Sequence, residues 1–443
     1  MASNSYSGDH EAAEGRRSAP TRFTLQSLIL IHIGLCCVSL FCVSLLYPEF
    51  HIFYRPTGLY AALAIIAAFA LVSVVFVLAD FSFGYFVGFY LYTMIAGYLW
   101  LNVFSEFVYN HQLTALSAAA SAVAFLLPAL FIRAPLKQVW TLTPKVLDLA
   151  LDAILLLGLV IFVVGASYNF RMVSIEDIYT FRDNLSSPTL LNYLTGMAST
   201  ALLPFAFACF VERGKYWRAG AVLLLLLSLY PVTLSKLVLL TPVWLVGMLL
   251  LSKILELRVA VIVSLLVPMA VGVVLFVLYR QEVWPYKATI PYFGLVNFRM
   301  LAIPSLAMDY YNEFFFRHDH TYFCQIGVLK RFVPCPYNEP LAIVIYNAFG
   351  IGGNYNASLF ATEGIASVGP LFAPVTALAC GLVIGLGNRM SAGLNPRFIL
   401  LSGALFPQTL LNIPFTTVLL TQGAAVLFLL WYVMPRQSSN GGQ

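Results

Sequence analysis

The run "AGAVLLLLLSLYPVTLSKLVLLTPVWLVGMLLLS", residues 219–252, contains one charged residue, Lys236. As a single helix it would measure about 51 Å, because each residue adds about 1.5 Å. The hydrocarbon core of a bilayer is only about 30 Å thick. We therefore predict two short spans that turn at Lys236, with Pro231 and Pro242 allowing the bend. One continuous span would instead move every later segment to the other side of the membrane.

The rest of the chain has the same apolar character. Of its 443 residues, 60% are hydrophobic and only 10% are charged, whereas roughly 25% are charged in a soluble domain. Backbone polar groups have no water partners inside a bilayer, so the spans must be helices. The sequence thus predicts an all-α polytopic membrane protein. About twelve spans are expected, at residues 24–47, 57–79, 84–105, 112–132, 147–167, 190–210, the two halves of 219–252, 259–279, 363–387, 398–416 and 418–434.

The positions of Lys and Arg predict the orientation, because short cytoplasmic loops hold most of these residues. With the amino terminus inside, the basic loops "RAPLKQVWTLTPK", "ERGKYWR", "KILELR" and "NRMSAGLNPR" all become cytoplasmic. The net charge of +5 is scattered between spans, so we expect no nucleic-acid partner. The predicted organisation is a disordered cytoplasmic tail (1–23), one transmembrane domain (24–434) with periplasmic segments at 168–189 and 280–362, and a second cytoplasmic tail (435–443).

Both predicted outer segments are rich in charge. In the shorter one, Ser174 and Asp177 form a helix-start pair, which predicts a short helix carrying Arg182. In the longer one, Pro304 can begin a helix whose polar face is Ser305, Asp309, Glu313 and Arg317 at four-residue spacing. Tyr310 and Tyr311 fall on other faces. This pattern predicts an amphipathic helix on the membrane surface.

The order of these features resembles the bacterial O-antigen polymerases, the Wzy-type oligosaccharide repeat unit polymerases. The similar pieces lie between Tyr168 and Gly385, and they are "YNFRMVSIEDIYTFRDNL", "TLSKLVLLTPV", "NFRMLAIPSLAMDYYNEFF" and "NYNASLFATEGIASVGPLFAP". The resemblance implies a GT-C-like glycosyltransferase in the bacterial inner membrane. Such an enzyme joins undecaprenyl-pyrophosphate-linked oligosaccharides at the periplasmic face, and a chain-length regulator protein is a possible partner.

The chemistry implied by the resemblance needs fixed cations, because negative charge develops on the departing pyrophosphate. Arginine remains charged and binds phosphate through two parallel hydrogen bonds. The candidates are Arg171, Arg182 and Arg299, although loop arginines also pair with nearby acids or lipid phosphates. Lys236 either contacts the pyrophosphate or extends to the membrane surface.

The attacking sugar hydroxyl must lose a proton, which requires a carboxylate or an imidazole. Asp309, Glu363 and His320 have suitable side chains, but each also has a purely structural explanation. Asn354 and Asn356 are candidates for binding sugar hydroxyls, and Tyr310 and Tyr311 for contacting lipid or sugar rings. Neither outer segment has an Asp-x-Asp pair, so we expect no metal, no cofactor and no nucleotide sugar.

Two other functions remain open on the sequence. An O-antigen ligase also uses a large outer loop but has a different acceptor. A lipid-linked sugar flippase would bury charges in several spans and show related halves, which this sequence does not. Separately, Cys324 and Cys335 share the outer loop and could form a disulfide if that loop faces an oxidising compartment, and the sequence leaves open whether they do.

Overall fold

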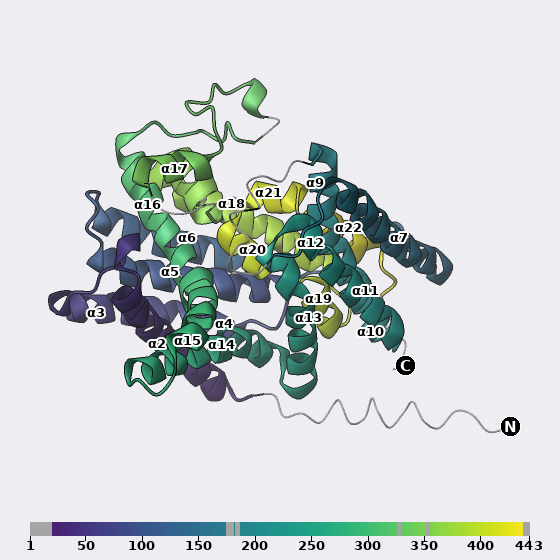
Figure 1. Ribbon diagram of the computed structural model, residues 1–443, viewed down its shortest axis with the longest axis horizontal. Coiled ribbons are helices and arrows are strands. Elements are labelled where there is room, and N and C mark those ends of the chain that lie inside the picture. Colours follow the sequence, from purple (N-terminus) through teal and green to yellow (C-terminus); the bar gives the residue numbers. More distant parts are fainter. Residues whose placement is uncertain are drawn as a thin grey trace.

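The computed structural model describes residues 20–173, 181, 187–326, 329–350, 355 and 357–436. These residues form helices and their connections, without a strand among them (Figure 1). The predicted all-α class is therefore confirmed. Most of both tails lies outside the described residues, as do the predicted helix around Ser174 and the candidates Arg182, Asn354 and Asn356.

Eleven helices of the described part are long and apolar enough to cross a membrane, which supports a multi-pass membrane protein. Several combine more than one helical segment. They are α2 (Arg22–Leu46), α3–η3–α4 (Leu59–Ala70, Leu71–Ser73, Val74–Leu78), α5 (Phe83–Phe104), α6 (His111–Phe131), α7 (Pro144–Tyr168), α9–η4–α10 (Thr189–Met197, Ala198–Leu202, Leu203–Glu212), α11–α12 (Tyr216–Ser228, Tyr230–Thr233), α13 (Lys236–Ile254), α14 (Leu257–Arg280), α15–η5–α16 (Tyr286–Phe293, Gly294–Ala302, Ile303–Arg317) and η7–α18 (Phe360–Ala366, Ser367–Ser391).

The predicted break in the run 219–252 is confirmed. The helix α11–α12 ends at Thr233, and α13 begins at Lys236. Between them, Leu234 has the left-handed backbone conformation (φ 45°), which reverses the chain. The two arms of the hairpin pack against each other. Lys236 therefore lies at the first residue of a helix, beside a turn.

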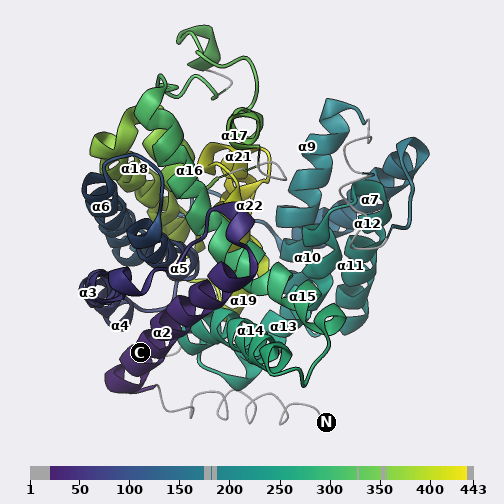
Figure 2. The ribbon, with the colours of Figure 1, turned by 60° about the vertical axis from the view of Figure 1, so that its left-hand side comes forward.

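The last two predicted spans are not continuous helices. Residues 396–433 form four short helices instead, α19 (Pro396–Ser402), α20 (Phe406–Asn412), α21 (Phe415–Leu420) and α22 (Ala424–Val433). Pro414 immediately precedes α21, and Gly423 interrupts the chain before α22 with φ 82°. Apolar residues lie on both sides of these breaks, so the hydropathy of the sequence did not predict them. In Figures 1 and 2 the four helices lie between a group containing α7, α10 and α11 and a group containing α5, α6 and α18.

The predicted surface helix is also wrong. The segment 286–317 is one helical element of 32 residues, long and apolar enough to span a membrane. Ser305 and Asp309, expected to face solvent, are 0% and 1% exposed. Ser305 donates to the Met94 carbonyl of α5 at 2.9 Å. The polar face of α16 is therefore paired with protein, which removes the need for water.

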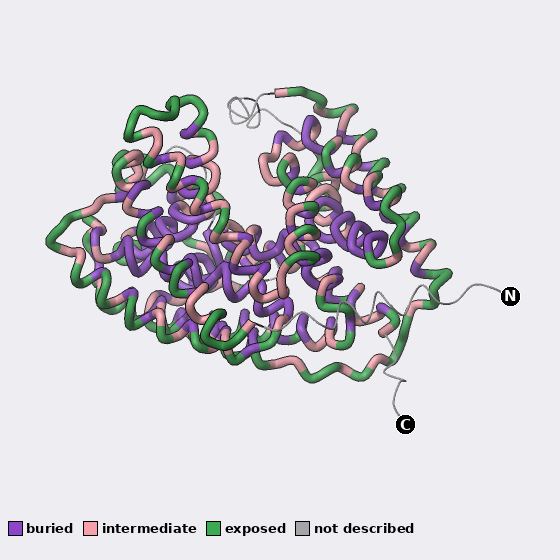
Figure 3. Tube along the Cα trace, turned by 90° about the horizontal axis from the view of Figure 1, so that it is seen from below, coloured by how far each residue is buried: buried purple, intermediate pink, exposed green. Residues whose placement is uncertain are grey.

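Helix α5 is the most deeply buried of the eleven membrane-length helices in the described part. Almost all of its residues are buried, whereas α7 exposes much of its apolar surface (Figure 3), as expected for a helix that faces lipid. Small residues let neighbours approach α5 closely. A Cβ on Gly84 would lie 1.9 Å from the Ala129 carbonyl oxygen of α6, and a Cβ on Gly97 would lie 2.4 Å from Ser305 Oγ of α16.

The connection from α16 to η7 projects beyond the helices (Figure 1). It contains η6 (Leu329–Arg331) and α17 (Leu341–Phe349). Cys324 and Cys335 are joined in a disulfide, a pairing that the sequence left open. The connection after α2 holds the short helix η1 (Pro48–Phe50), and η2 (Pro56–Gly58) forms the first turn of the second membrane-length element.

Candidate functional site

Two candidate cations from distant parts of the chain lie close together. Lys236 begins α13, and Arg299 lies in η5, a π-helical segment. The two side chains are near enough for their charges to interact. Arg299 is exposed and Lys236 is half-buried. π-Helical segments are rare and are frequently found at functional sites, and like charges brought together favour an anionic ligand between them.

Arg299 also faces a tyrosine that sequence analysis missed. Tyr355 is buried, and burial raises its pKa, while the charge of Arg299 opposes that rise. Its ring centroid lies 5.3 Å from that of Tyr310, and its carbonyl accepts a hydrogen bond from the Tyr311 hydroxyl at 3.4 Å. In the sequence, Tyr355 lies between the candidate residues Asn354 and Asn356. That position was the only indication in the sequence that Tyr355 belongs to the site.

Tyr310 and Tyr311 do not face lipid as expected, because both are completely buried. Tyr310 donates a hydrogen bond to the Phe50 carbonyl at 3.0 Å. Tyr311 is close enough to Glu363 for its hydroxyl to interact with the carboxylate. Tyr310 and Tyr311 therefore pack against Tyr355 and Glu363. A direct contact between either buried ring and a substrate would require that ring to move.

Glu363 is a buried carboxylate with three hydrogen-bond donors. It lies in η7, another π-helical segment, and is 7% exposed. One oxygen accepts from the Thr416 backbone N–H at 2.9 Å and from the Thr416 hydroxyl at 3.0 Å, and the other accepts from the Thr362 hydroxyl at 2.7 Å. Thr416 carried no signal in the sequence, since it lies inside a predicted span.

His320 lies near the end of the same π-helical segment. The next residue, Thr321, donates its backbone N–H to the Ala366 carbonyl at 2.8 Å. Burial lowers the pKa of His320, and the charge of Asp319 opposes that fall. A Cβ on Gly369 would lie only 2.6 Å from His320 Nε2. The close approach of α18, the helix that contains Gly369, therefore sets the position of the His320 imidazole.

Arg171 approaches the Lys236 hairpin from another direction. Its backbone N–H donates to the Pro231 carbonyl of α12 at 3.0 Å, and the Tyr230 hydroxyl donates to the Val173 carbonyl at 2.6 Å. Its guanidinium lies 5.7 Å from the ring centroid of Phe181. The segment that carries Arg171 is thus fixed to α12, just before the turn that leads to Lys236.

Asp309 differs from the other candidates because protein surrounds it completely. One carboxylate oxygen accepts from Ser105 Oγ at 2.8 Å, and the other accepts from the Tyr109 hydroxyl. Burial raises the pKa of Tyr109, and the neighbouring Tyr98 and Asp309 raise it further. Glu313, one turn later, accepts from the Val108 N–H at 2.7 Å. Asp309 therefore fastens the α5–α6 connection to α16.

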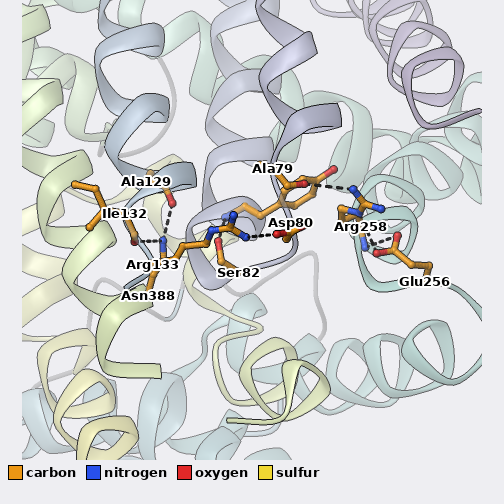
Figure 4. A network of polar contacts seen from close by, with 10 residues as sticks. Ala79, Asp80, Ser82, Ala129, Ile132, Arg133, Glu256, Arg258 and Asn388 are labelled. Atoms are coloured by element: carbon orange, nitrogen blue, oxygen red, sulfur yellow. Dashed lines mark hydrogen bonds and ion pairs between the residues drawn. The ribbon is translucent and has the colours of Figure 1, made fainter. Parts of the chain in front are cut away.

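A second group of charges, at other helix ends, is paired internally (Figure 4). Arg133 contacts Asp80 at 2.9 Å, and Arg258 contacts Glu256 at 3.0 Å. Asn388 accepts from the Gly84 N–H at 2.8 Å and donates to the Ala129 carbonyl at 2.7 Å. These contacts link helix ends to each other, so this group is structural.

Within the described residues, no cluster of three or more His, Cys, Asp or Glu side chains is arranged to hold a metal ion. Charge interactions pair Lys236 with Arg299 and Arg299 with Tyr355, and Glu363 lies near Tyr311. Comparison of the chain with protein-family models, curated proteins and solved structures finds no match.

Proposed function

We propose that this protein polymerises lipid-linked oligosaccharide repeat units into a surface polysaccharide. The donor is an oligosaccharide on undecaprenyl pyrophosphate, and the acceptor is the sugar of a second lipid-linked unit. The observation that carries the proposal is the meeting of Lys236 and Arg299, whose charges interact although 62 residues separate them. Two cations whose charges interact, one of them at the first residue of a membrane-length helix, suit a pyrophosphate held at the bilayer surface.

The proposed reaction uses the chain's own side chains. The bond between the donor sugar and the pyrophosphate breaks, and a new bond forms to the acceptor hydroxyl oxygen. Arg299 and Lys236, with Arg171 beside the hairpin, stabilise the charge that moves to the pyrophosphate. The hydroxyl proton goes to Glu363 or to neutral His320. Asp309 has an indirect role, because it holds the α5–α6 connection against α16.

Two observations support a periplasmic site in a bacterial inner membrane. The Cys324–Cys335 disulfide lies in the connection between α16 and η7, and disulfides persist in oxidising compartments. The basic loop residues Arg133, Arg213 and Arg258 lie at the ends of other helices, as the positive-inside rule expects of cytoplasmic loops. The same proposal places both termini in the cytoplasm, which requires that the element 286–317 does not cross the membrane from one side to the other. It also includes a GT-C-like arrangement and a chain-length regulator partner.

Reconstitution would test the proposal directly. The purified chain in proteoliposomes, given an undecaprenyl-pyrophosphate-linked repeat unit, should produce a ladder of longer glycans without a nucleotide sugar and in the presence of EDTA. A ligase would transfer glycan only when a lipid A core acceptor is added. A flippase would move the lipid-linked unit across the bilayer without lengthening it. Either of these results would refute polymerisation.

A further inference from the structure

The outer connection between α16 and η7 is fastened to a kink in the element η7–α18. Pro370 has no N–H, so the Ala366 carbonyl one turn earlier lacks its helical donor. The Thr321 N–H donates to that carbonyl at 2.8 Å, and the Tyr322 N–H donates to the Ser367 carbonyl at 3.2 Å. The outer connection therefore supplies hydrogen-bond donors at the point where the kinked helix lacks one.

Two further features belong to this attachment. Tyr322 and Phe323 have left-handed backbone conformations, with φ 47° and 63°. Bulky residues rarely adopt this conformation, which persists only where surrounding contacts hold the chain. Cys324 is buried, donates its N–H to the Thr321 carbonyl at 2.9 Å and is bonded to Cys335. A single tight turn thus joins the disulfide to the attachment.

Hydrogen bonds lead from Thr321 to Glu363. Thr321 Oγ1 lies 3.2 Å from Ser367 Oγ, and Ser367 donates its single hydroxyl proton to the Thr362 carbonyl at 2.8 Å. Thr321 must therefore donate to Ser367. The Thr362 hydroxyl in turn lies 2.7 Å from a Glu363 carboxylate oxygen. All of these residues are buried, so loss of one hydroxyl leaves its neighbour without that partner.

We propose that Thr321 is a positioning residue, which orients the Glu363 carboxylate through these hydrogen bonds. The neighbouring disulfide keeps Thr321 in place. The inference rests on the proposed function, in which the acceptor proton goes to Glu363 or to His320. Because His320 directly precedes Thr321, the same attachment places both of these side chains. Thr321 acts without touching the substrate.

Paired substitutions in proteoliposomes test the role of Thr321. Thr321→Val removes the hydroxyl, so kcat for glycan extension should fall roughly threefold to tenfold, whereas KM for the lipid-linked unit should stay unchanged. Thr321→Ser keeps the hydroxyl and should retain the wild-type kcat. Thr376→Val is the control, because Thr376 donates to the Ala373 carbonyl of its own helix at 2.8 Å, and it should match the wild type. Equal kcat in Thr321→Val and Thr321→Ser, or a change in KM alone, would overturn the inference.

Infrared spectroscopy separates this inference from the proposed function, because it needs no substrate. In the full chain labelled with ¹³C-glutamate, the Glu363 band is the one that disappears in Glu363→Gln. Thr321→Val should shift this band, and Thr321→Ser should leave it at the wild-type position. An unshifted band in Thr321→Val would overturn the inference even if the wild type makes glycans. A shifted band in a protein that makes no glycan would refute the proposed function alone.

Two changes that leave Thr321 intact decide the matter if Thr321→Val does not fold. Ser367→Ala removes the hydroxyl that receives the Thr321 hydrogen bond, and it should shift the Glu363 band. Reduction of the disulfide in the folded wild type, verified by alkylation of Cys324 and Cys335, should shift the band too. An unshifted band in Ser367→Ala would overturn the connection to Glu363, and an unshifted band after reduction would overturn the role of the disulfide.

Discussion

Replacing Arg299 with lysine keeps the positive charge next to Lys236 but removes the two parallel donors of the guanidinium. If Arg299 binds the departing pyrophosphate, the loss is one preorganised donor to a developing oxyanion. Such a loss typically costs about 2.7–4 kcal/mol, which corresponds to roughly a hundredfold to thousandfold slower reaction. The total charge of the site is unchanged, so any large effect must come from hydrogen-bond geometry.

Arg317→Lys is the matched control on the same helical element. Arg317 pairs with Glu313 at 2.9 Å, and its side chain is 56% exposed. The Glu313 side chain is only 12% exposed, but lysine keeps the positive charge beside it on the solvent side. The substitution should therefore cost no more than about 1 kcal/mol, and glycan synthesis should fall less than about fivefold. Both variants are compared at equal membrane abundance, by the initial rate of ladder formation in proteoliposomes. Normal chains from Arg299→Lys, or equal losses in both variants, would refute the assigned role of Arg299.

Three further predictions follow from individual contacts. Thr416→Val removes a hydroxyl donor to the Glu363 carboxylate, and a hydrogen bond to a charged group is worth about 1.5–3 kcal/mol. Polymerisation should therefore fall roughly tenfold to a hundredfold, whereas the control Thr416→Ser, which keeps the hydroxyl, should remain close to wild type. Equal rates in the Val and Ser variants would contradict this. Asn388→Leu leaves the Gly84 N–H and the Ala129 carbonyl without their amide partner, at about 1–3 kcal/mol each if both stay buried, so the unfolding midpoint should fall clearly; an unchanged midpoint would show that other groups replace the amide. Mass spectrometry after alkylation of the unfolded chain should find Cys324 modified only when a reductant is added, and modification without reductant would argue against an oxidising location.

The sequence predicted the helices well where hydropathy alone decides the outcome. Apolar runs of about 20 residues must be helical in a bilayer, because nothing else satisfies the backbone. The break at Lys236 could be predicted in the same way, because a single helix would exceed the membrane thickness. Two cysteines in one connection made a disulfide feasible, but the sequence did not decide whether it forms.

Hydropathy did not distinguish a polar helix paired with protein from one that faces water. The helix α16 was predicted to lie on the surface because Ser305, Asp309 and Glu313 share a face. The structure buries that face against α5 and the α5–α6 connection, where Met94, Ser105 and Tyr109 provide the partners. Those partners lie about 200 residues away in the sequence, so local periodicity contained no information about them.

The sequence by itself determined that this chain is a bundle of membrane helices, and it identified residue types suited to binding pyrophosphate. Only the tertiary structure decided which of these side chains meet. Arg299 lies near Lys236 and Tyr355. Thr416, in the short helix α21, donates a hydrogen bond to Glu363 in η7. The physical reason is that spanning a bilayer depends on the local free energy of transfer. The composition of a site depends on close packing and hydrogen bonds between helices that are distant in the sequence.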